Sequence, residues 1–240
     1  MLPKFGIETT VVDGREIENW EQAIRPNTKV FFFETPANPT MEVIDIRSVC
    51  ALARAKGITS VVDNAFATNV LQRPMEFGAD VVAYSATKMM DGQGRVLAGA
   101  VCGTEEFIEG PLLAFIRNTG PTLSAFNAWV VLKGLETLDL RIRRQSDNAL
   151  EVGRFLEQRV EKILHPGLPS HPQHNLAMSQ MEAAGPIFSL YVGGGRKQAH
   201  GLLNGLKLID ISNNIGDSRS LMCHPASTTH HGLGEEARLE

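Results

Sequence analysis

The chain has 240 residues, of which 43% are hydrophobic and 21% are charged, and this composition is typical of a globular protein with one large domain or two small ones. Its net charge of −4 leaves no basic surplus to neutralise a phosphodiester backbone. The composition therefore argues against a nucleic-acid partner and favours a small-molecule enzyme.

Cysteine usage and hydropathy indicate the compartment. Cys50, Cys102 and Cys223 are widely spaced and form no CxxC pair, which favours free thiols in a reducing compartment, by default the cytoplasm. The N-terminus lacks the apolar core of a signal peptide, and no stretch approaches the roughly 20 apolar residues of a membrane span. We therefore expect a soluble chain.

The first half of the chain predicts alternating strands and helices. Val30–Glu34 is a continuous apolar run that suits a parallel strand buried on both faces, and its three phenylalanines are expected in the core. Prolines stop this strand within residues 35–40. Asp45 is expected to cap a helix over residues 48–56, and Gly57 occupies the position of a left-handed stop.

Three further apolar runs continue this pattern. Residues 60–63, 81–85 and 97–102 are each predicted to form a strand. Strands that alternate with helical segments predict an α/β sheet with helices on both faces.

Apolar residues recur at helical spacing from residue 124 onward. The stripe consists of Ala128, Val131, Leu132, Leu135, Leu138, Ile142, Ala149, Val152, Leu156 and Val160. It predicts one long helix or a kinked pair with its apolar face in the core. We expect this segment to bridge a large domain, residues 1–140, and a smaller α+β domain, residues 141–240.

The smaller domain is expected to contain strands at residues 187–192 and 208–212 and a helix at residues 197–206. The basic cluster at residues 141–144 predicts a solvated face or an ion-pair site between subunits.

Functional side chains follow two of the predicted strands. Asp63 ends the strand at residues 60–63, and Ser85, Thr87 and Lys88 lie at the end of the strand at residues 81–85. In open α/β sheets, ligands bind outside the carboxyl ends of the strands. Pyridoxal phosphate (PLP) needs a lysine amine, an acid for its pyridine nitrogen and donors for its phosphate. The pattern therefore predicts a PLP site.

Other interpretations compete at each position. An aspartate after a Val-Val run is often a turn residue or a helix cap, and most lysines are solvated. Cys223, His224, His230 and His231 are zinc-type ligands but lack a CxxC or HExxH spacing. Cys223 and His224 would point apart in an extended segment, which argues against a nucleophilic cysteine. No GxGxxG or GxxxxGK[ST] loop is present.

Three groups of short motifs stand out along the chain. They are E-T-P-A-N-P-T at residues 34–40, V-D-N-A-F-A-T at residues 62–68, and G-A-D at residues 78–80 with S-A-T-K at residues 85–88. These motifs resemble the cystathionine γ-synthase family of trans-sulfuration enzymes, which are PLP proteins of the aspartate-aminotransferase-like fold (fold type I). The resemblance spans essentially the whole chain. D-G-Q-G-R at residues 91–95 is similar to the O-succinylhomoserine sulfhydrylase branch, and Met89 stands where tyrosine is common.

The resemblance implies roles for individual residues. Lys88 would bind PLP through a Schiff base and shuttle protons, and Asp63 would pair with the pyridinium nitrogen. Ser85 and Thr87 would hold the phosphate. Asn38 would hydrogen-bond the ring oxygen of the cofactor or the carboxylate of the substrate.

The implied reaction is the PLP-dependent replacement of the γ-substituent of O-succinylhomoserine by sulfide, which gives homocysteine in methionine biosynthesis. The same residues would serve a cystathionine γ-synthase, which uses cysteine, or a methionine or cystathionine γ-lyase. Asn214 stands in place of a family serine and is the expected substrate contact. The family also implies a homodimer or homotetramer for the full-length protein.

The resemblance further implies that the chain is truncated at both ends. Family segments that precede the L-P-K-F-G-I start would supply a glycine-rich phosphate loop, a ring-stacking tyrosine, and a tyrosine and an arginine for the neighbouring subunit. The family's carboxylate-binding arginine would follow the last residues, and Arg238 does not match it. A non-catalytic fragment, or a partner subunit, is therefore the alternative interpretation.

Overall fold

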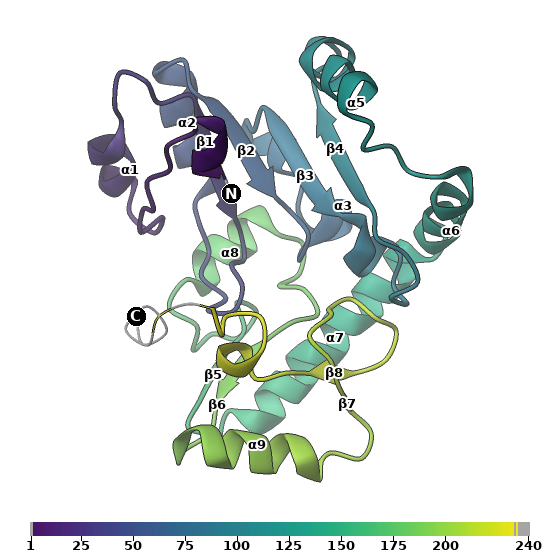
Figure 1. Cartoon of the computed structure of the whole chain (residues 1–240). Helices are drawn as coiled ribbons and strands as arrows, with labels where there is room; N and C mark the ends of the chain where they lie inside the picture. Colours follow the sequence, from purple (N-terminus) through teal and green to yellow (C-terminus); the bar gives the residue numbers. More distant parts are fainter. Residues whose placement is uncertain (1, 233, 235–240) are drawn as a thin grey trace.

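The computed structural model describes residues 2–232 and residue 234, and its central element is a four-stranded sheet with the order β1-β2-β3-β4. Strands β1 (Val30–Glu34), β2 (Thr59–Asp63) and β3 (Val81–Ser85) are parallel, whereas β4 (Gly99–Gly103) is antiparallel to β3. The carboxyl ends of the first three strands therefore meet at one edge (Figure 1). The predicted, mainly parallel α/β sheet is confirmed.

Short helices precede, connect and follow these strands. They are η1 (Leu2–Phe5), α1 (Ile17–Ala23), α2 (Ile46–Ala55), α3 (Thr68–Leu71), η2 (Pro74–Phe77), η3 (Ala86–Met90), α4 (Glu105–Phe107), η4 (Ile108–Leu112) and α5 (Leu113–Thr119). The roles predicted for the two flanking residues of α2 are confirmed, because the Asp45 carboxylate accepts a hydrogen bond from Ser48 N at 3.0 Å and Gly57 has a φ of 66°. The helix itself begins two residues before the predicted start and ends one residue before the predicted end.

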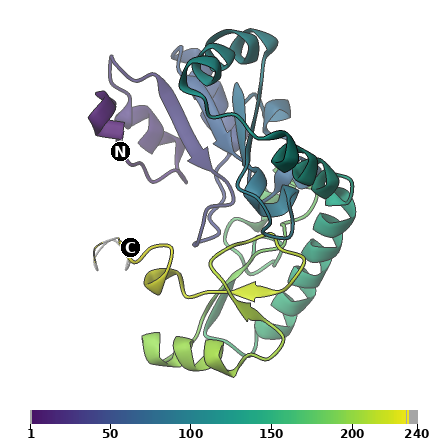
Figure 2. The same cartoon turned by 45° about the vertical axis from the view of Figure 1, so that its right-hand side comes forward.

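The second half of the chain contains two small sheets and the longest helix. Its elements are α6 (Ala125–Leu135), α7 (Leu138–Leu156), β5 (Lys162–Leu164), α8 (His174–Gln180), β6 (Ser189–Tyr191), α9 (Gly195–Gly205), β7 (Asp210–Ile211), β8 (Leu221–Met222) and η5 (Pro225–Ser227). β5 pairs with β6, and β7 pairs with β8. Figures 1 and 2 show α7 running from the region of the large sheet to the small sheets and α9.

The core lies mainly on one face of the large sheet. Phe31 and Phe33 are buried against Trp20 of α1, with ring centroids 4.9 and 5.6 Å away. Phe32 is 62% exposed, so the prediction that this strand is buried on both faces was wrong. Successive side chains of a strand point to opposite faces, and within the described residues the helices that bury β1 pack on the Phe31 side. The expected helical cover is therefore incomplete here.

The predicted helical stripe is a kinked pair, broken between Leu135 and Leu138. Leu138, Ile142 and Ala149 of α7 are buried as expected, but Leu132 and Leu135 of α6 and Val152 of α7 are exposed. Helix α6 instead approaches the core through Gly134, where an added Cβ would overlap Met90 O. This close approach turns part of the apolar stripe of α6 away from the core. The expectation of a buried stripe was therefore wrong for part of α6 and for Val152 of α7.

Boundaries of the shorter elements differ from the predictions by a few residues. The strand predicted from residue 97 begins at Gly99, and Leu97 is exposed. The strand predicted at residues 187–192 is limited to Ser189–Tyr191, and that at residues 208–212 to Asp210–Ile211. In the part of the chain that is described, no helix combines the length and the apolar character that a bilayer crossing requires.

Candidate active site

A cavity of about 180 Å³ lies at the carboxyl edge of the large sheet. Its lining residues come from the ends of three strands, from the segments that follow these strands, and from two later segments; they are Glu34, Asn38, Asp63, Ala65, Phe66, Ser85, Lys88, Asn213, Ile215 and Thr229. Four of the six residues predicted from the sequence are therefore brought together, namely Asn38, Asp63, Ser85 and Lys88. This is the position that parallel strands dictate for a ligand site.

Lys88 lies in the turn η3, directly after β3. It interrupts the helical backbone of this turn with φ −89° and ψ −119°. Its Nζ donates a hydrogen bond to Asn214 Oδ1 at 2.8 Å. The fifth predicted residue, Asn214, therefore contacts the lysine amine, although the two residues are 126 positions apart in the chain.

Asp63 ends β2 and is half-buried beside the cavity. Burial raises the pKa of its carboxyl group, while a hydrogen bond from Ala65 N, 3.0 Å from Oδ1, opposes that rise. Next to it, Asn64 is fully buried and donates to the carbonyls of Thr68 and Gln72 at 3.0 and 2.9 Å. This network fixes the backbone that directs Asp63 toward the cavity.

Glu34 is a cavity residue for which we predicted no role from the sequence. It ends β1 in register with Asp63, and its Oε2 accepts a hydrogen bond from Asn38 N at 3.1 Å. Burial, together with the negative charge of Asp63, raises the pKa of the Glu34 carboxyl group to about 7, and the hydrogen bond from Asn38 N opposes that rise. The signal was present, because Glu34 opens the E-T-P-A-N-P-T motif at the end of a predicted strand.

The two predicted phosphate ligands differ in geometry. Ser85 lines the cavity, and its hydroxyl forms no hydrogen bond with the residues that the structure describes. The Thr87 hydroxyl donates to Ala98 O at 3.2 Å and accepts from Ala98 N at 2.9 Å. Thr87 would have to give up its donated bond before it could donate to a phosphate, so its role stays a prediction.

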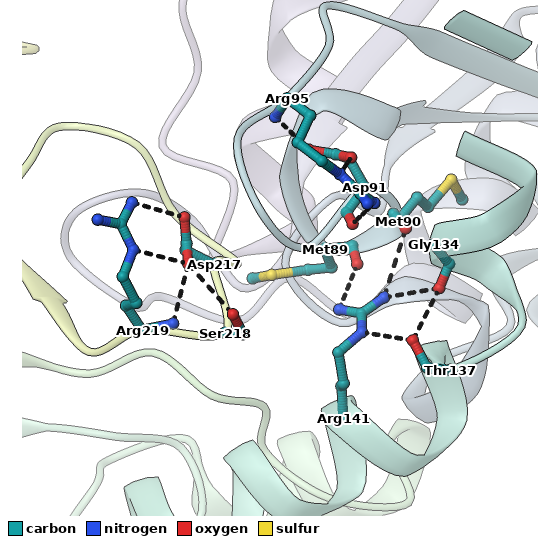
Figure 3. A network of polar contacts seen from close by, with 10 residues as sticks. All are labelled: Met89, Met90, Asp91, Arg95, Gly134, Thr137, Arg141, Asp217, Ser218 and Arg219. Atoms are coloured by element: carbon teal, nitrogen blue, oxygen red, sulfur yellow. Dashed lines mark hydrogen bonds and ion pairs between the residues drawn. The ribbon is translucent and has the colours of Figure 1, made fainter. Parts of the chain in front are cut away.

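Arg141 departs from the expectation of a solvated basic face at residues 141–144, whereas Arg143 and Arg144 are exposed as expected. The guanidinium of Arg141 is half-buried and donates to Met89 O at 2.9 Å, to Gly134 O at 2.9 Å and to Met90 O at 3.4 Å. Its Nε also donates to Thr137 Oγ1 at 3.0 Å (Figure 3). Arg141 therefore holds the backbone that follows Lys88. Sequence reasoning missed this because the contact joins positions about 50 residues apart.

The histidines weighed as zinc ligands have other contacts. His224 Nδ1 lies 2.6 Å from Ser227 Oγ, and His230 Nδ1 lies 2.8 Å from Thr229 Oγ1. Across residues 2–232 and 234, no three His, Cys, Asp or Glu side chains gather where they could hold a metal ion.

The cavity groups fit PLP by the chemistry of their side chains. Lys88 offers an amine, Asp63 a carboxylate for a cationic ring nitrogen, and Ser85 a hydroxyl without a hydrogen bond to any described residue. A mainly parallel sheet with a lysine and an acid at its carboxyl edge defines the class of PLP-dependent enzymes of fold type I. Within this class, the chain belongs to the Cys/Met metabolism PLP-dependent enzymes, whose family model matches residues 1–240.

Individual relatives agree with this assignment. The chain is 46% identical to an O-succinylhomoserine sulfhydrylase of Mycobacterium tuberculosis, covering 99% of this chain and 60% of that protein. It is 42% identical to an L-methionine gamma-lyase of Porphyromonas gingivalis, again covering 99% and 60%. A solved structure of cystathionine gamma synthase from Xanthomonas oryzae pv. oryzae, in complex with aminoacrylate and cysteine, superposes with a TM-score of 0.91 at 34% identity, covering 95% of this chain and 59% of that one.

The chain thus spans about 60% of the length of the curated relatives that it matches. Arg238, which we weighed as a substrate-binding residue, lies outside the described residues.

Proposed function

We propose that the protein of which this chain is part replaces the γ-substituent of O-succinylhomoserine with sulfide and so forms homocysteine. The observation that carries the proposal is the placement of Lys88 and Asp63 at one cavity, with the Lys88 amine 2.8 Å from Asn214 Oδ1. The 46% identity to an O-succinylhomoserine sulfhydrylase supports this substrate class.

The residues of the cavity would share the binding of PLP. Asp63 would hold the positive charge of the ring nitrogen, and Ser85 would donate its hydroxyl to the phosphate. Asn38 would donate its side-chain amide to the ring oxygen or to a substrate carboxylate. Bound there, PLP would withdraw electrons from the α-carbon of an amino acid and so make its proton acidic.

Lys88 would then move protons. Its amine would accept a proton from the α-carbon of a bound amino acid and return it when the product forms. Asn214 Oδ1 would accept a hydrogen bond from the ammonium form of Lys88, which keeps the Nζ in the cavity between these transfers. Succinate leaves the γ-carbon with its bonding electron pair, and sulfide supplies the new pair to that carbon.

Replacement by cysteine, or elimination without replacement, would use the same groups. The similarity to a cystathionine gamma synthase and to an L-methionine gamma-lyase keeps both outcomes as alternatives. We also propose the division into residues 1–140 and 141–240, a cytoplasmic setting in keeping with the free thiols Cys50, Cys102 and Cys223, and a homodimer or homotetramer of the full-length protein.

Product analysis tests this proposal. The chain, supplied with PLP, is incubated with O-succinylhomoserine and either sulfide, cysteine or neither. Homocysteine formed with sulfide, and lost in Lys88→Ala, is the expected result. Cystathionine from cysteine, or an α-keto acid without a donor, would select one of the alternatives. A chain that binds PLP but turns over none of these mixtures would overturn catalysis by this chain and favour a non-catalytic fragment.

A further inference from the structure

Two side chains of one helix hold the two segments that meet at the Lys88 amine. Arg141 and Gln145 lie one turn apart on α7 and therefore project from the same side. Arg141 donates to Met89 O, the carbonyl that follows Lys88, at 2.9 Å. Gln145 Nε2 donates to Asp217 O at 2.9 Å, three residues after Asn214.

Arg141 contacts mainly backbone carbonyl groups. A guanidinium carries five N–H donors in a rigid fork. Among the described residues, the guanidinium donates hydrogen bonds to the carbonyls of Met89, Met90 and Gly134 and to a hydroxyl. No carboxylate of these residues forms an ion pair with it. Figure 3 shows the guanidinium pointing at these carbonyl groups. An added Cβ on Gly92, whose φ is 71°, would overlap Arg141 Nη1, so the turn after Lys88 is shaped to admit this side chain.

The loop of residues 212–218, which Gln145 contacts, packs directly on residues 88–92, the segment that contains Lys88 (the lysine segment). Ser218 N donates to Gly92 O at 2.8 Å. Gly216 has a φ of 80°, and a Cβ added to it would overlap Met89 Sδ and lie 2.6 Å from Met89 N. The two segments are therefore in contact along their backbones, and the Lys88–Asn214 hydrogen bond lies at the cavity end of this contact.

We propose that Arg141 and Gln145 are positioning residues, which fix how the lysine segment and the loop of residues 212–218 lie relative to each other. This relative position determines the direction in which Lys88 presents its amine to the cavity. The inference rests on the proposed function of Lys88 as the residue that binds PLP. It predicts that a substitution on α7, outside the cavity, changes the reactivity of the Lys88 amine through Asn214.

The reactivity of Lys88 tests this inference on the whole chain without cofactor. Trace acetylation at a fixed pH, followed by mass spectrometry, gives the rate at Lys88 relative to the exposed Lys207. We expect Asn214→Ala to accelerate acetylation of Lys88 about two- to tenfold, because the amine loses its hydrogen-bond partner. Gln145→Ala should do the same in the wild-type background and add little in the Asn214→Ala background.

Arg141→Met should also accelerate acetylation of Lys88, and Arg141→Lys should restore part of the wild-type rate because an ammonium can still donate to Met89 O. Asn148→Ala and Arg144→Met change exposed side chains of the same helix and are the matched controls. If Arg141→Met does not fold, Thr137→Val removes one hydrogen bond of Arg141 and replaces it in the series.

Folded variants of Gln145 and Arg141 whose Lys88 reacts at the rate of the controls would overturn the inference. Independent, multiplying effects of Gln145→Ala and Asn214→Ala would also overturn it, because the effect would not pass through Asn214. The readout needs no PLP. A chain that fails to bind PLP would therefore contradict the proposed function while the acetylation rates still decide this inference.

Discussion

Glu34 and Asp63 end neighbouring parallel strands in register, and both residues line the same cavity as Lys88. Two adjacent acids in a half-buried site do not readily ionise together. The raised pKa of Glu34, about 7, reflects burial first and the charge of Asp63 as well. Near neutral pH Glu34 is therefore partly protonated, which reduces the repulsion between the two carboxyl groups.

The first prediction is that Glu34 makes stability fall as pH rises. In the folded chain Glu34 keeps its proton up to about pH 7, whereas the unfolded chain loses it near the ordinary value for glutamate. The folded state thus binds more protons between these values, and the free energy of unfolding decreases as pH rises through them. Between about pH 5 and about pH 8, the free energy of unfolding of the wild type should fall by roughly 1–3 kcal/mol more than that of Glu34→Gln.

Urea unfolding at both pH values measures this difference. Glu106→Gln, a change at an exposed glutamate, is the control and should follow the wild type. Equal pH dependence of the wild type and Glu34→Gln would show that Glu34 is ionised throughout.

The second prediction concerns Asp63 and the cofactor. Asp63→Asn keeps an oxygen for the hydrogen bond from Ala65 N but removes the charge that would pair with the ring nitrogen. We expect the affinity for PLP to fall about tenfold to a hundredfold, since a hydrogen bond to a charged group is worth more than a neutral one. Titration followed by absorbance measures the affinity. Asp45→Asn, at the N-terminus of α2, is the control, because asparagine caps a helix as well as aspartate; equal losses in both variants would exclude a specific role for Asp63.

The third prediction concerns the close contact of Gly216 with the lysine segment. Gly216→Ala requires a left-handed backbone for alanine and a shift of Met89 N, which lies 2.6 Å from the added Cβ. We expect loss of PLP binding or of product formation by about tenfold or more, with the fold retained, because the lysine segment moves relative to the loop. Circular dichroism and PLP titration measure the two effects separately.

Gly201→Ala is the matched control for that variant. Gly201 lies in α9, and nothing stands within 4 Å of an added Cβ. Alanine should stabilise this helix by about 0.5–1 kcal/mol and leave PLP binding unchanged. Unaltered PLP binding in Gly216→Ala would show that the loop does not determine the position of Lys88.

The fourth prediction separates the two faces of β1. Phe33 is 4% exposed and packs on Trp20, whereas Phe32 is 62% exposed. Phe33→Ala should lower the free energy of unfolding by about 3–5 kcal/mol. Phe32→Ala should change it by about 0.5 kcal/mol or less, as is usual for surface positions. Equal destabilisation by both substitutions, measured by denaturant unfolding, would mean that Phe32 is covered in solution.

Much of the sheet and part of the site could be predicted from local patterns. Buried strands are continuous apolar runs, so Asp63 and Ser85 were recognisable as strand-end residues, and Lys88 as the residue that follows. Asn38 and Asn214 came only from the resemblance, because an asparagine in a loop carries no pattern of its own.

Other features depend on contacts between distant segments and could not be read locally. Apolar sequence shows that Phe32 can be buried, but only the packing shows that the described residues leave it exposed. Arg141 looked like part of a surface cluster, and its true partners are backbone carbonyls, which every residue possesses. Thr87 carries the expected hydroxyl, yet Ala98 already engages it.

The site of covalent attachment of PLP tests most directly whether Lys88 is the residue that binds the cofactor. The chain is incubated with PLP, reduced with borohydride and digested, and the modified lysine is identified by mass spectrometry, with Lys88→Ala treated in parallel. Our account predicts one stoichiometric modification at Lys88 and none in the variant. A folded chain that carries no modification, or carries it equally at surface lysines in both proteins, would contradict it.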